Sequence, residues 1–354
     1  MHARAIAARA HRARPPDLQR RRDDMPHQDR AQGLRVGIIG TGGISRAHAP
    51  GWIELGADLH CYSHSGGEAF AEQFGATVHG TREELLAAVD VVDVCTPTPA
   101  HAEIVHAALD AGCDVVCEKP LTLTTEDARA VIAHAERAGR HLFPAHVVRY
   151  FPQYAAAKQA VDNGAVGTPA VLRYERTGEA PGQDWYADDE ASGGIIMDQM
   201  IHDLDQAIWI AGPVTSVYAQ QSVGEGPDTV RTGHVVLTHA GGAISHCRGL
   251  WGPPGTAFRY TFDIAGDAGR LQYDSDGDPA VQLDAVAAAR SQGEGGYLPD
   301  VSSMRSPYSK EIREFTAAIT NGEPARVSAA DGAYVVEVSR AALESLATGR
   351  SIPC

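Results

Sequence analysis

The feature that most constrains the fold of this chain is a glycine-rich turn between two predicted elements. Residues 34–40 (LRVGIIG) form a continuous apolar run of strand length, and residues 44–55 follow a helical pattern. Between them lies Gly40-Thr41-Gly42-Gly43-Ile44-Ser45, in which Ser45 replaces a third glycine. Such a turn lets backbone amides approach a pyrophosphate, and the helix N-terminus favours its charge. The stretch predicts a dinucleotide-binding unit, although the glycines alone would also fit an ordinary tight turn.

The alternation of apolar runs and helical patterns continues through the first half of the chain. Thr81 and Glu84 form a capping box at a helix start. Further strands are predicted at residues 58–63, 91–96, 114–117 and 142–148. Strands alternating with helices are typical of a parallel sheet covered on both faces. We therefore expect an α/β fold whose first domain, residues 34–150, is a Rossmann-type doubly wound parallel sheet.

The pattern changes after a predicted helix at residues 152–163. Strands with mostly short connections are predicted at residues 170–176, 214–223, 232–238, 243–250, 259–265 and 270–273. Short connections favour antiparallel pairing. The second domain, residues 151–354, is therefore expected to be an α+β unit with a large, mostly antiparallel open sheet.

Composition limits the partners of the chain. Residues 1–33 hold eight arginines, four aspartates and no lysine, so they are predicted to be a disordered leader, with Met25 an alternative start. The net charge is -15, or -19 once these eight positive and four negative charges are removed, which argues against nucleic acid. The sequence has no apolar run of about 18 residues for a membrane span. Six cysteines are too sparse for a disulfide framework, which indicates a reducing compartment. We expect a cytoplasmic protein that acts on a small molecule.

The end of the second strand bears on the choice of dinucleotide. NAD-binding units usually carry an acid there for the ribose hydroxyls. Here the strand ends in Ser63 and His64, and its acid, Asp58, stands at the other end. Hydroxyl and imidazole groups suit a ribose phosphate, so the sequence favours NADP slightly over NAD and leaves the choice open.

A lysine follows directly on another predicted strand. Glu118-Lys119-Pro120 comes after the run that ends at Cys117, so it lies at the carboxyl edge of the sheet, where doubly wound folds bind ligands. Lys119 could stabilise negative charge on a reacting oxygen. The alternative is a surface lysine before a turn-forming proline.

A second candidate stretch is a predicted helix that opens after Gly193 and Gly194. Asp198, His202 and Asp205 fall at i, i+4 and i+7, followed by Trp209 at i+11, so they are expected to share one helix face. His202 suits acid–base chemistry near neutral pH, and Asp198 is expected to orient it. A surface hydrogen-bonded pair and a metal site are the alternatives. No metal is predicted, because hydride transfer needs none if Lys119 polarises the oxygen.

Several ordered motifs carry a family resemblance. They are VGIIGTGGI at 36–44, CTPTPAH at 95–101, CEKP at 117–120, HVVRYFP at 146–152 and GGIIMDQMIHDLD at 193–205. Together they resemble the Gfo/Idh/MocA oxidoreductases, and the similarity extends from about residue 34 to the C-terminus. The resemblance implies that Lys119, Asp198 and His202 are the catalytic residues. It also implies a homo-oligomer, a dimer or tetramer, formed through an exposed apolar face of the second sheet.

The resemblance implies further site residues as well. Those expected around the cofactor are Gly40, Gly42, Gly43, Ile44, Ser63, His64, Thr96, Pro97, Thr98, His101, Glu118 and Lys119, and the resemblance allows a cis Lys119–Pro120 peptide. His146, Arg149 and Trp185 are expected in or behind the substrate pocket, although His146 and Arg149 equally fit buried, satisfied polar residues.

The predicted function is NAD(P)-dependent hydride transfer at a hydroxyl or carbonyl carbon of a sugar, inositol or related polyol. Two alternatives stay open. One is a dinucleotide-binding regulatory or sensor protein without turnover, and the other is a family reductase acting on a non-sugar substrate such as a dihydrodiol. Substrate identity and reaction direction cannot be inferred from the sequence.

Overall fold

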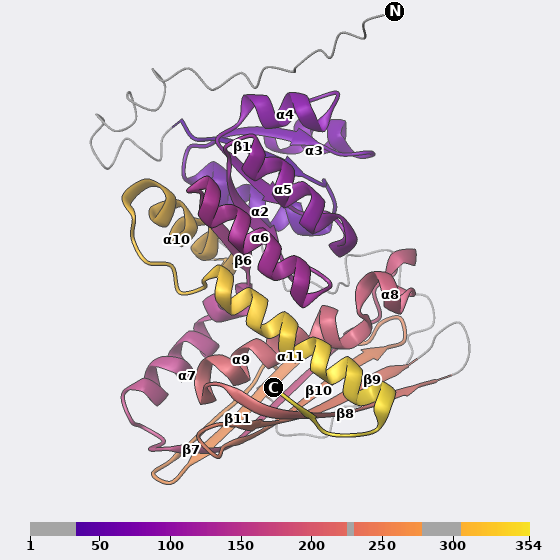
Figure 1. The fold of residues 1–354 in the computed structure, drawn as a ribbon, viewed down its shortest axis with the longest axis vertical. Coiled ribbons are helices and arrows are strands. Elements are labelled where there is room, and N and C mark those ends of the chain that lie inside the picture. Colours follow the sequence, from indigo (N-terminus) through magenta and orange to yellow (C-terminus); the bar gives the residue numbers. More distant parts are fainter. Residues whose placement is uncertain (1–32, 225–229, 278–305) are drawn as a thin grey trace, which may run out of the picture.

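The computed structural model describes residues 33–224, 230–277 and 306–354, which form two sheets and the helices that cover them (Figure 1). The predicted leader lies outside the described residues, apart from Gly33. In the part of the chain that is described, no helix combines the length and the apolarity needed to cross a bilayer.

The first sheet has six parallel strands in the order β3-β2-β1-β4-β5-β6. They are β1 (Arg35–Ile39), β2 (Asp58–Tyr62), β3 (Thr77–Val78), β4 (Val91–Val94), β5 (Asp114–Glu118) and β6 (Leu142–Ala145). Helices α2 (Gly43–Glu54), α3 (Gly67–Phe74), α4 (Arg82–Ala88), α5 (His101–Asp110) and α6 (Thr125–Ala138) connect them. This order is that of a doubly wound dinucleotide fold, so the predicted Rossmann domain is confirmed. The short elements α3 and β3 were not predicted.

Local sequence signals account for several helix boundaries. The Thr81 side chain accepts the backbone N–H of Glu84 and the Glu84 carboxylate accepts that of Thr81, which is the predicted capping box of α4. Thr124 caps α6, and Gly139, at φ +60°, ends it. A left-handed residue at this position favours glycine.

The second sheet has seven strands in the order β12-β11-β7-β10-β9-β8-β13. They are β7 (Pro169–Glu179), β8 (Val214–Val223), β9 (Arg231–His239), β10 (Ile244–Gly252), β11 (Arg259–Gly266), β12 (Arg270–Asp274) and β13 (Ile352–Pro353). Among the described strands of this sheet, only β7 and β10 pair in parallel, so the mostly antiparallel sheet is confirmed. Helices α7 (Pro152–Asp162), α8 (Asp189–Ser192), α9 (Ile201–Ala211) and α11 (Ala329–Thr348) complete this half, and α9 and α11 lie between the sheet and the first domain (Figure 1).

The helix α10 (Pro307–Asn321) comes after β12 of the second sheet in sequence but packs in the first domain. Its buried Ile312 and Phe315 belong to the same core cluster as β1, and the Phe315 ring stacks on Phe143 of β6 at 4.7 Å between centroids. Gly51 of α2 allows the approach, because a Cβ there would lie 3.1 Å from the Cα of Ser309. The predicted division at residue 150 did not anticipate this return of the chain.

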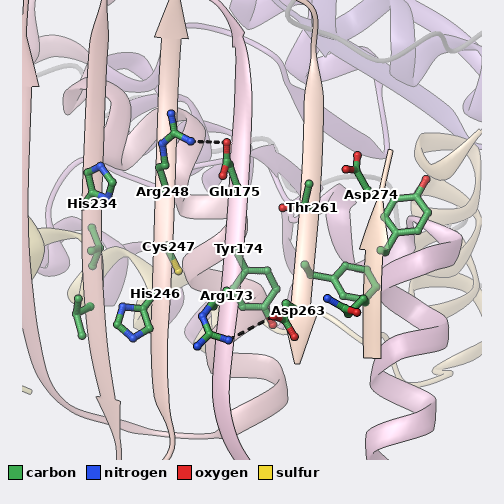
Figure 2. A pocket seen from close by; sticks show the side chains of 15 residues that line it. Arg173, Tyr174, Glu175, His234, His246, Cys247, Arg248, Thr261, Asp263 and Asp274 are labelled. Atoms are coloured by element: carbon green, nitrogen blue, oxygen red, sulfur yellow. Dashed lines mark hydrogen bonds and ion pairs between the residues drawn. The ribbon is translucent and has the colours of Figure 1, made fainter. Parts of the chain in front are cut away.

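The outward face of the second sheet carries an open hollow of about 820 Å³ (Figure 2). Ion pairs cross neighbouring strands there, between Arg248 and Glu175 at 2.5 Å and between Arg173 and Asp263 at 3.3 Å. Tyr174 and Cys247, also drawn in Figure 2, are buried. Paired charges thus accompany apolar surface on this face, and the oligomer expected to form through it stays a prediction.

Candidate active site

The candidate site lies at the carboxyl edge of the parallel sheet. Gly40 follows β1, Thr96 follows β4 by two residues, Glu118 ends β5, and His146 follows β6. Because all these strands run in the same direction, the loops that follow them meet at one edge. The motifs at residues 95–101, 117–120 and 146–152 therefore lie at the same edge of the sheet as the glycine turn.

The glycine turn has the geometry that a pyrophosphate needs. Gly40 has φ +93°, and a Cβ on it would lie 2.6 Å from the carbonyl oxygen of Cys95. Gly42 is exposed, and a Cβ there would meet nothing within 4 Å. Helix α2 starts at Gly43 without a side-chain cap, so its first amides are open to an anion. Ser45 donates to the carbonyl of Gly42 at 2.7 Å and closes the turn.

The end of β2 lacks an acidic side chain. Asp58 is the first residue of the strand and Tyr62 the last, and the half-buried Ser63 and exposed His64 follow. The hydroxyl of Thr41 donates to the carbonyl of Ser65 at 3.0 Å, which ties this end to the glycine turn. No carboxylate from these residues would repel a ribose phosphate.

The loop after β4 is tied to the loop after β5. The ring of His101 lies 2.9 Å from the carbonyl oxygens of both Thr96 and Pro120, and burial lowers the pKa of His101. A neutral ring donates to one of these carbonyls at a time. The Lys119–Pro120 peptide is cis. Thr98 is buried, and the buried hydroxyl of Thr96 has no partner among the described residues.

Lys119 reaches across to the second half of the chain. Its Nζ donates to the backbone oxygen and to Oδ1 of Asp198, each at 2.8 Å. The side chains are 11% and 4% exposed. A charge-assisted hydrogen bond in so little solvent holds the amine firmly. The pair therefore joins the two stretches that the sequence had identified separately.

Asp198 lies on a π-helical turn, Ile196–Met200, rather than on the regular helix that was expected. Gly193 precedes it at φ +72°, where a Cβ would lie 2.4 Å from the Cβ of Met197. Helix α9 begins only at Ile201, so the 3.6-residue spacing does not run from Asp198 to His202. The expected support of His202 by Asp198 is corrected: Asp198 binds Lys119, and Nδ1 of His202 is buried without a partner in the described part of the chain.

His202 is half-buried at this junction. Burial first, and then the positive charge of Lys119, lowers its pKa well below the ordinary value. The ring is therefore neutral at neutral pH, which suits a group that accepts a proton.

The structure assigns different surroundings to the three residues expected near substrate. Arg149 is buried and donates to both carboxylate oxygens of Asp205, at 2.6 to 3.1 Å. Trp185 is half-buried and packs on Tyr186 at 3.8 Å between ring centroids. His146 is fully buried, and neither of its ring nitrogens has a partner among the described residues. Arg149 is thus a satisfied core residue, whereas His146 has unmet hydrogen-bonding capacity.

The metal site that the sequence left as an alternative is not assembled. Asp198 is bound to Lys119 and Asp205 to Arg149, so the two carboxylates and His202 have separate partners or none. The described residues contain one other group with metal-ligand spacing, namely His48, Asp93 and Cys95.

The sequence interpretation missed three residues near the Lys119–Asp198 pair. Burial, and then the charge of Asp198, raises the pKa of Tyr186, whose ring lies edge-on to Trp251 at 6.3 Å. Oε1 of the buried Gln199 and Nε1 of Trp251 have no partner among the described residues. Gln199 stands beside Asp198 in sequence, but nothing local marks Trp251, which comes from β10.

The fold is that of a dinucleotide-binding protein with a second, largely antiparallel sheet. Comparison with known proteins gives the family. Residues 34–146 match the model described as oxidoreductase family, NAD-binding Rossmann fold, and residues 154–272 match the GFO/IDH/MocA C-terminal domain. The chain therefore belongs to the Gfo/Idh/MocA family of oxidoreductases, as the resemblance of its motifs implied.

Relatives of this chain act on sugars and polyols. Myo-inositol 2-dehydrogenase of Thermotoga maritima is 31% identical over 90% of this chain and 98% of its own length. D-xylose 1-dehydrogenase (NADP(+)) 2 of Haloferax volcanii is 29% identical over 90% and 99%. The crystal structure of GenD2 from gentamicin A biosynthesis, in complex with NAD, has a TM-score of 0.80 and 28% identity over 91% of this chain and 97% of that one. The chain is an oxidoreductase of this sugar and polyol dehydrogenase family.

Proposed function

We propose that the protein transfers hydride between NAD(P) and a hydroxyl-bearing carbon of a sugar, inositol or related polyol. The observation that carries the proposal is the 2.8 Å contact between Lys119 and Asp198 beside the neutral His202. An ammonium group held at this position can bind the reacting oxygen and stabilise its negative charge. The named activities of the relatives agree with this substrate class.

Each of the three site residues has its own role in the proposed reaction. Lys119 binds the substrate oxygen, and Asp198 holds Lys119 in place. His202 takes the hydroxyl proton while the carbon–hydrogen bond breaks and the carbonyl forms. A cofactor bound at the carboxyl edge of the first sheet would supply the nicotinamide that takes up the hydride. The reverse reaction uses the same groups, with protonated His202 as the acid.

The cofactor would lie along the carboxyl edge of the first sheet. Gly40, Gly42, Gly43 and Ile44 would cradle the pyrophosphate, because Gly42 has open space and the amides of α2 lack a cap. The residues proposed along the remainder of the dinucleotide are Thr96, Pro97, Thr98, His101 and Glu118. Ser63 and His64, which bring no carboxylate to the end of β2, favour NADP.

The pocket for the substrate would lie between Lys119 and the second sheet. His146 and Trp185 are proposed to contact substrate. Neither ring nitrogen of His146 has a partner among the described residues, and Trp185 packs on Tyr186, whose pKa is raised by burial and by Asp198. Arg149 is proposed to support the pocket through Asp205. No disulfide joins the five buried cysteines of the described residues, in keeping with the proposed cytoplasmic location.

We also propose a homo-oligomer formed through the outward face of the second sheet. The hollow there spans several strands and carries paired charges that a second copy could meet (Figure 2). Light scattering of the purified protein would test this. A mass of one chain at micromolar concentration would contradict it.

A turnover screen tests the proposed function. The purified protein is assayed with a panel of polyols and sugars and with NAD and NADP, alongside the Lys119→Met variant and the surface control Lys310→Met. We expect Lys119→Met to lower kcat by about 10²-fold or more while the cofactor still binds, and Lys310→Met to behave as wild type.

The outcomes of this screen distinguish the proposed function from the two alternatives that the sequence left open. Near wild-type turnover by Lys119→Met would refute the assigned role. Tight cofactor binding with no turnover on any substrate would favour a sensor, and turnover only on a dihydrodiol would favour the non-sugar reductase.

A further inference from the structure

A buried network of charged side chains lies beneath the candidate site. His48 of α2 stands between two carboxylates: its Nδ1 lies 3.0 Å from Asp93 of β4, and its Nε2 lies 3.1 Å from Oε1 of Glu118. Trp52 donates to Asp93 at 2.8 Å. The side chains of His48 and Asp93 are fully buried and that of Glu118 is 7% exposed. Glu118 is proposed above to lie along the dinucleotide, whereas His48, Asp93 and Trp52 have no role in the proposed function.

A single charged ring bridges the two carboxylates of this network. Burial disfavours a charged imidazole, but the Asp93 carboxylate outweighs burial and raises the pKa of His48 well above its ordinary value. The ring is therefore an imidazolium that donates from both nitrogens. Burial raises the pKa of Glu311 of α10, which is also buried near His48, well above its ordinary value. One cation thus holds two carboxylates that come from different strands.

His48, Asp93 and Cys95 have the spacing of metal ligands, but hydrogen bonds among the buried side chains already occupy their ligand atoms. Both nitrogens of His48 face carboxylates, and Asp93 accepts from Trp52 and from the thiol of Cys95 at 3.4 Å. Burial raises the pKa of Cys95, which keeps the sulfur protonated and a poor ligand. The geometry favours an ion network over a metal centre.

The network reaches the loop that follows β5 and carries Lys119. The second carboxylate oxygen of Glu118, Oε2, accepts the backbone N–H of Lys119 at 2.8 Å. A continuous chain of contacts therefore runs from His48 through Glu118 to the backbone of Lys119, whose side chain reaches Asp198. Because the backbone sets the direction of the side chain, a shift of Glu118 moves the amine.

We propose that His48 is a positioning residue for Lys119, acting through Glu118. It lies on α2, the helix whose N-terminus faces the pyrophosphate site, so the same helix positions the cofactor and the lysine. The proposal rests on the proposed catalytic role of Lys119, but the placement of the Lys119 amine can be tested without it.

Two substitutions separate the two contacts of His48. In His48→Gln the amide nitrogen can take the place of Nε2 and keep the contact with Glu118. In His48→Asn the shorter amide can take the place of Nδ1 and keep only the contact with Asp93. A matched control is His239→Gln, which removes a buried histidine that bonds Gly212 and Ser245 in the second half of the chain, away from Lys119.

The first readout is steady-state kinetics. We expect His48→Asn to lower kcat by about 10- to 100-fold with KM and cofactor Kd changed less than about threefold, because a misplaced catalytic group costs rate rather than binding. His48→Gln and His239→Gln should keep kcat within about threefold. Equal kcat losses in both His48 variants, or a loss in neither, would overturn the proposal.

The second readout does not need turnover. The chain has three lysines, Lys119, Lys158 and Lys310, so acylation by acetic anhydride can be followed at each by peptide mass spectrometry. His48→Asn should raise the labelling rate of Lys119 relative to the other two, and His48→Gln should not. An unchanged Lys119 rate in both variants would overturn the proposal.

These readouts distinguish failure of the inference from failure of the proposed function. If the wild-type protein turns over no substrate, the proposed function fails while the labelling still tests the placement of Lys119. Zinc at one equivalent per chain, measured by elemental analysis of the purified protein, would contradict the ion network and with it this role for His48.

Discussion

The buried pair of Arg149 and Asp205 allows a prediction that can be worked from the structure. Both side chains are 2% exposed, and three hydrogen bonds of 2.6 to 3.1 Å join them. Removing one partner of a buried pair costs about 3–5 kcal/mol, since the remaining charge is left without compensation. Asparagine keeps one acceptor, and Asp331 lies 3.5 Å from Arg149, so we expect the lower end of this range for Asp205→Asn.

The expected effect is a loss of about 3 kcal/mol in the free energy of unfolding, or a fall in Tm of about 6–12 °C. Urea and thermal denaturation followed by circular dichroism would measure it. The matched control is Glu337→Gln, because Glu337 pairs with Arg129 at 2.8 Å but the two side chains are 39% and 65% exposed. An exposed pair contributes about 0–1 kcal/mol, so the control should change little.

Two results would refute this reasoning. One is a loss below about 1 kcal/mol for Asp205→Asn, which would mean that the pair is not buried as described. The other is a stable Arg149→Lys variant whose substrate KM rises more than about tenfold, which would place Arg149 in the substrate site rather than behind it.

Three further predictions concern the candidate site. His202→Ala should lower kcat/KM most at neutral pH and less at high pH, where hydroxide can act as the base; an equal loss at every pH would argue against a base. Because the pKa of His202 is lowered, the unfolded chain binds a proton there below pH 6.5 and the folded chain does not. Wild-type stability in urea should therefore fall by about 1 kcal/mol more than that of His202→Gln between pH 6.5 and 5.5, and equal falls would contradict the neutral ring. Gly40→Ala should lower the free energy of unfolding by at least about 1–2 kcal/mol, because Gly40 has a positive φ. Gly42→Ala should keep the wild-type stability but bind the cofactor more weakly. The opposite pattern in thermal melting and cofactor titration would contradict the proposed pyrophosphate site. 

The strands and helices of the first domain could be predicted because their signals are local. An apolar run, a capping box and a glycine at a helix end each act within a few residues, and the boundaries of α4 and α6 follow from them. The return of α10 to the first sheet could not be predicted in this way. Its position depends on packing against Phe143 and Gly51, which lie more than 150 residues away in the chain.

The site residues that could be predicted from the sequence are those that directly follow a strand. Lys119 and the glycine turn follow strands directly, so topology alone places them together. The partner of Asp198 was not predictable, because the π-helical turn at Ile196–Met200 breaks the periodicity on which the shared helix face depended.

The buried network did leave a signal in the sequence. Asp93 stands within the apolar strand β4 (VVDV), and a carboxylate there needs a buried partner. The sequence could not show that the partner is His48, since that depends on how α2 crosses the sheet.

The most direct test of the central claim is a calorimetric titration of the purified protein with NADH and, in parallel, with NADPH. We predict saturable binding of one dinucleotide per chain, tighter for NADPH, and weaker binding in Gly42→Ala. Binding of neither dinucleotide would contradict the cofactor site, and with it the roles proposed for Lys119 and His202.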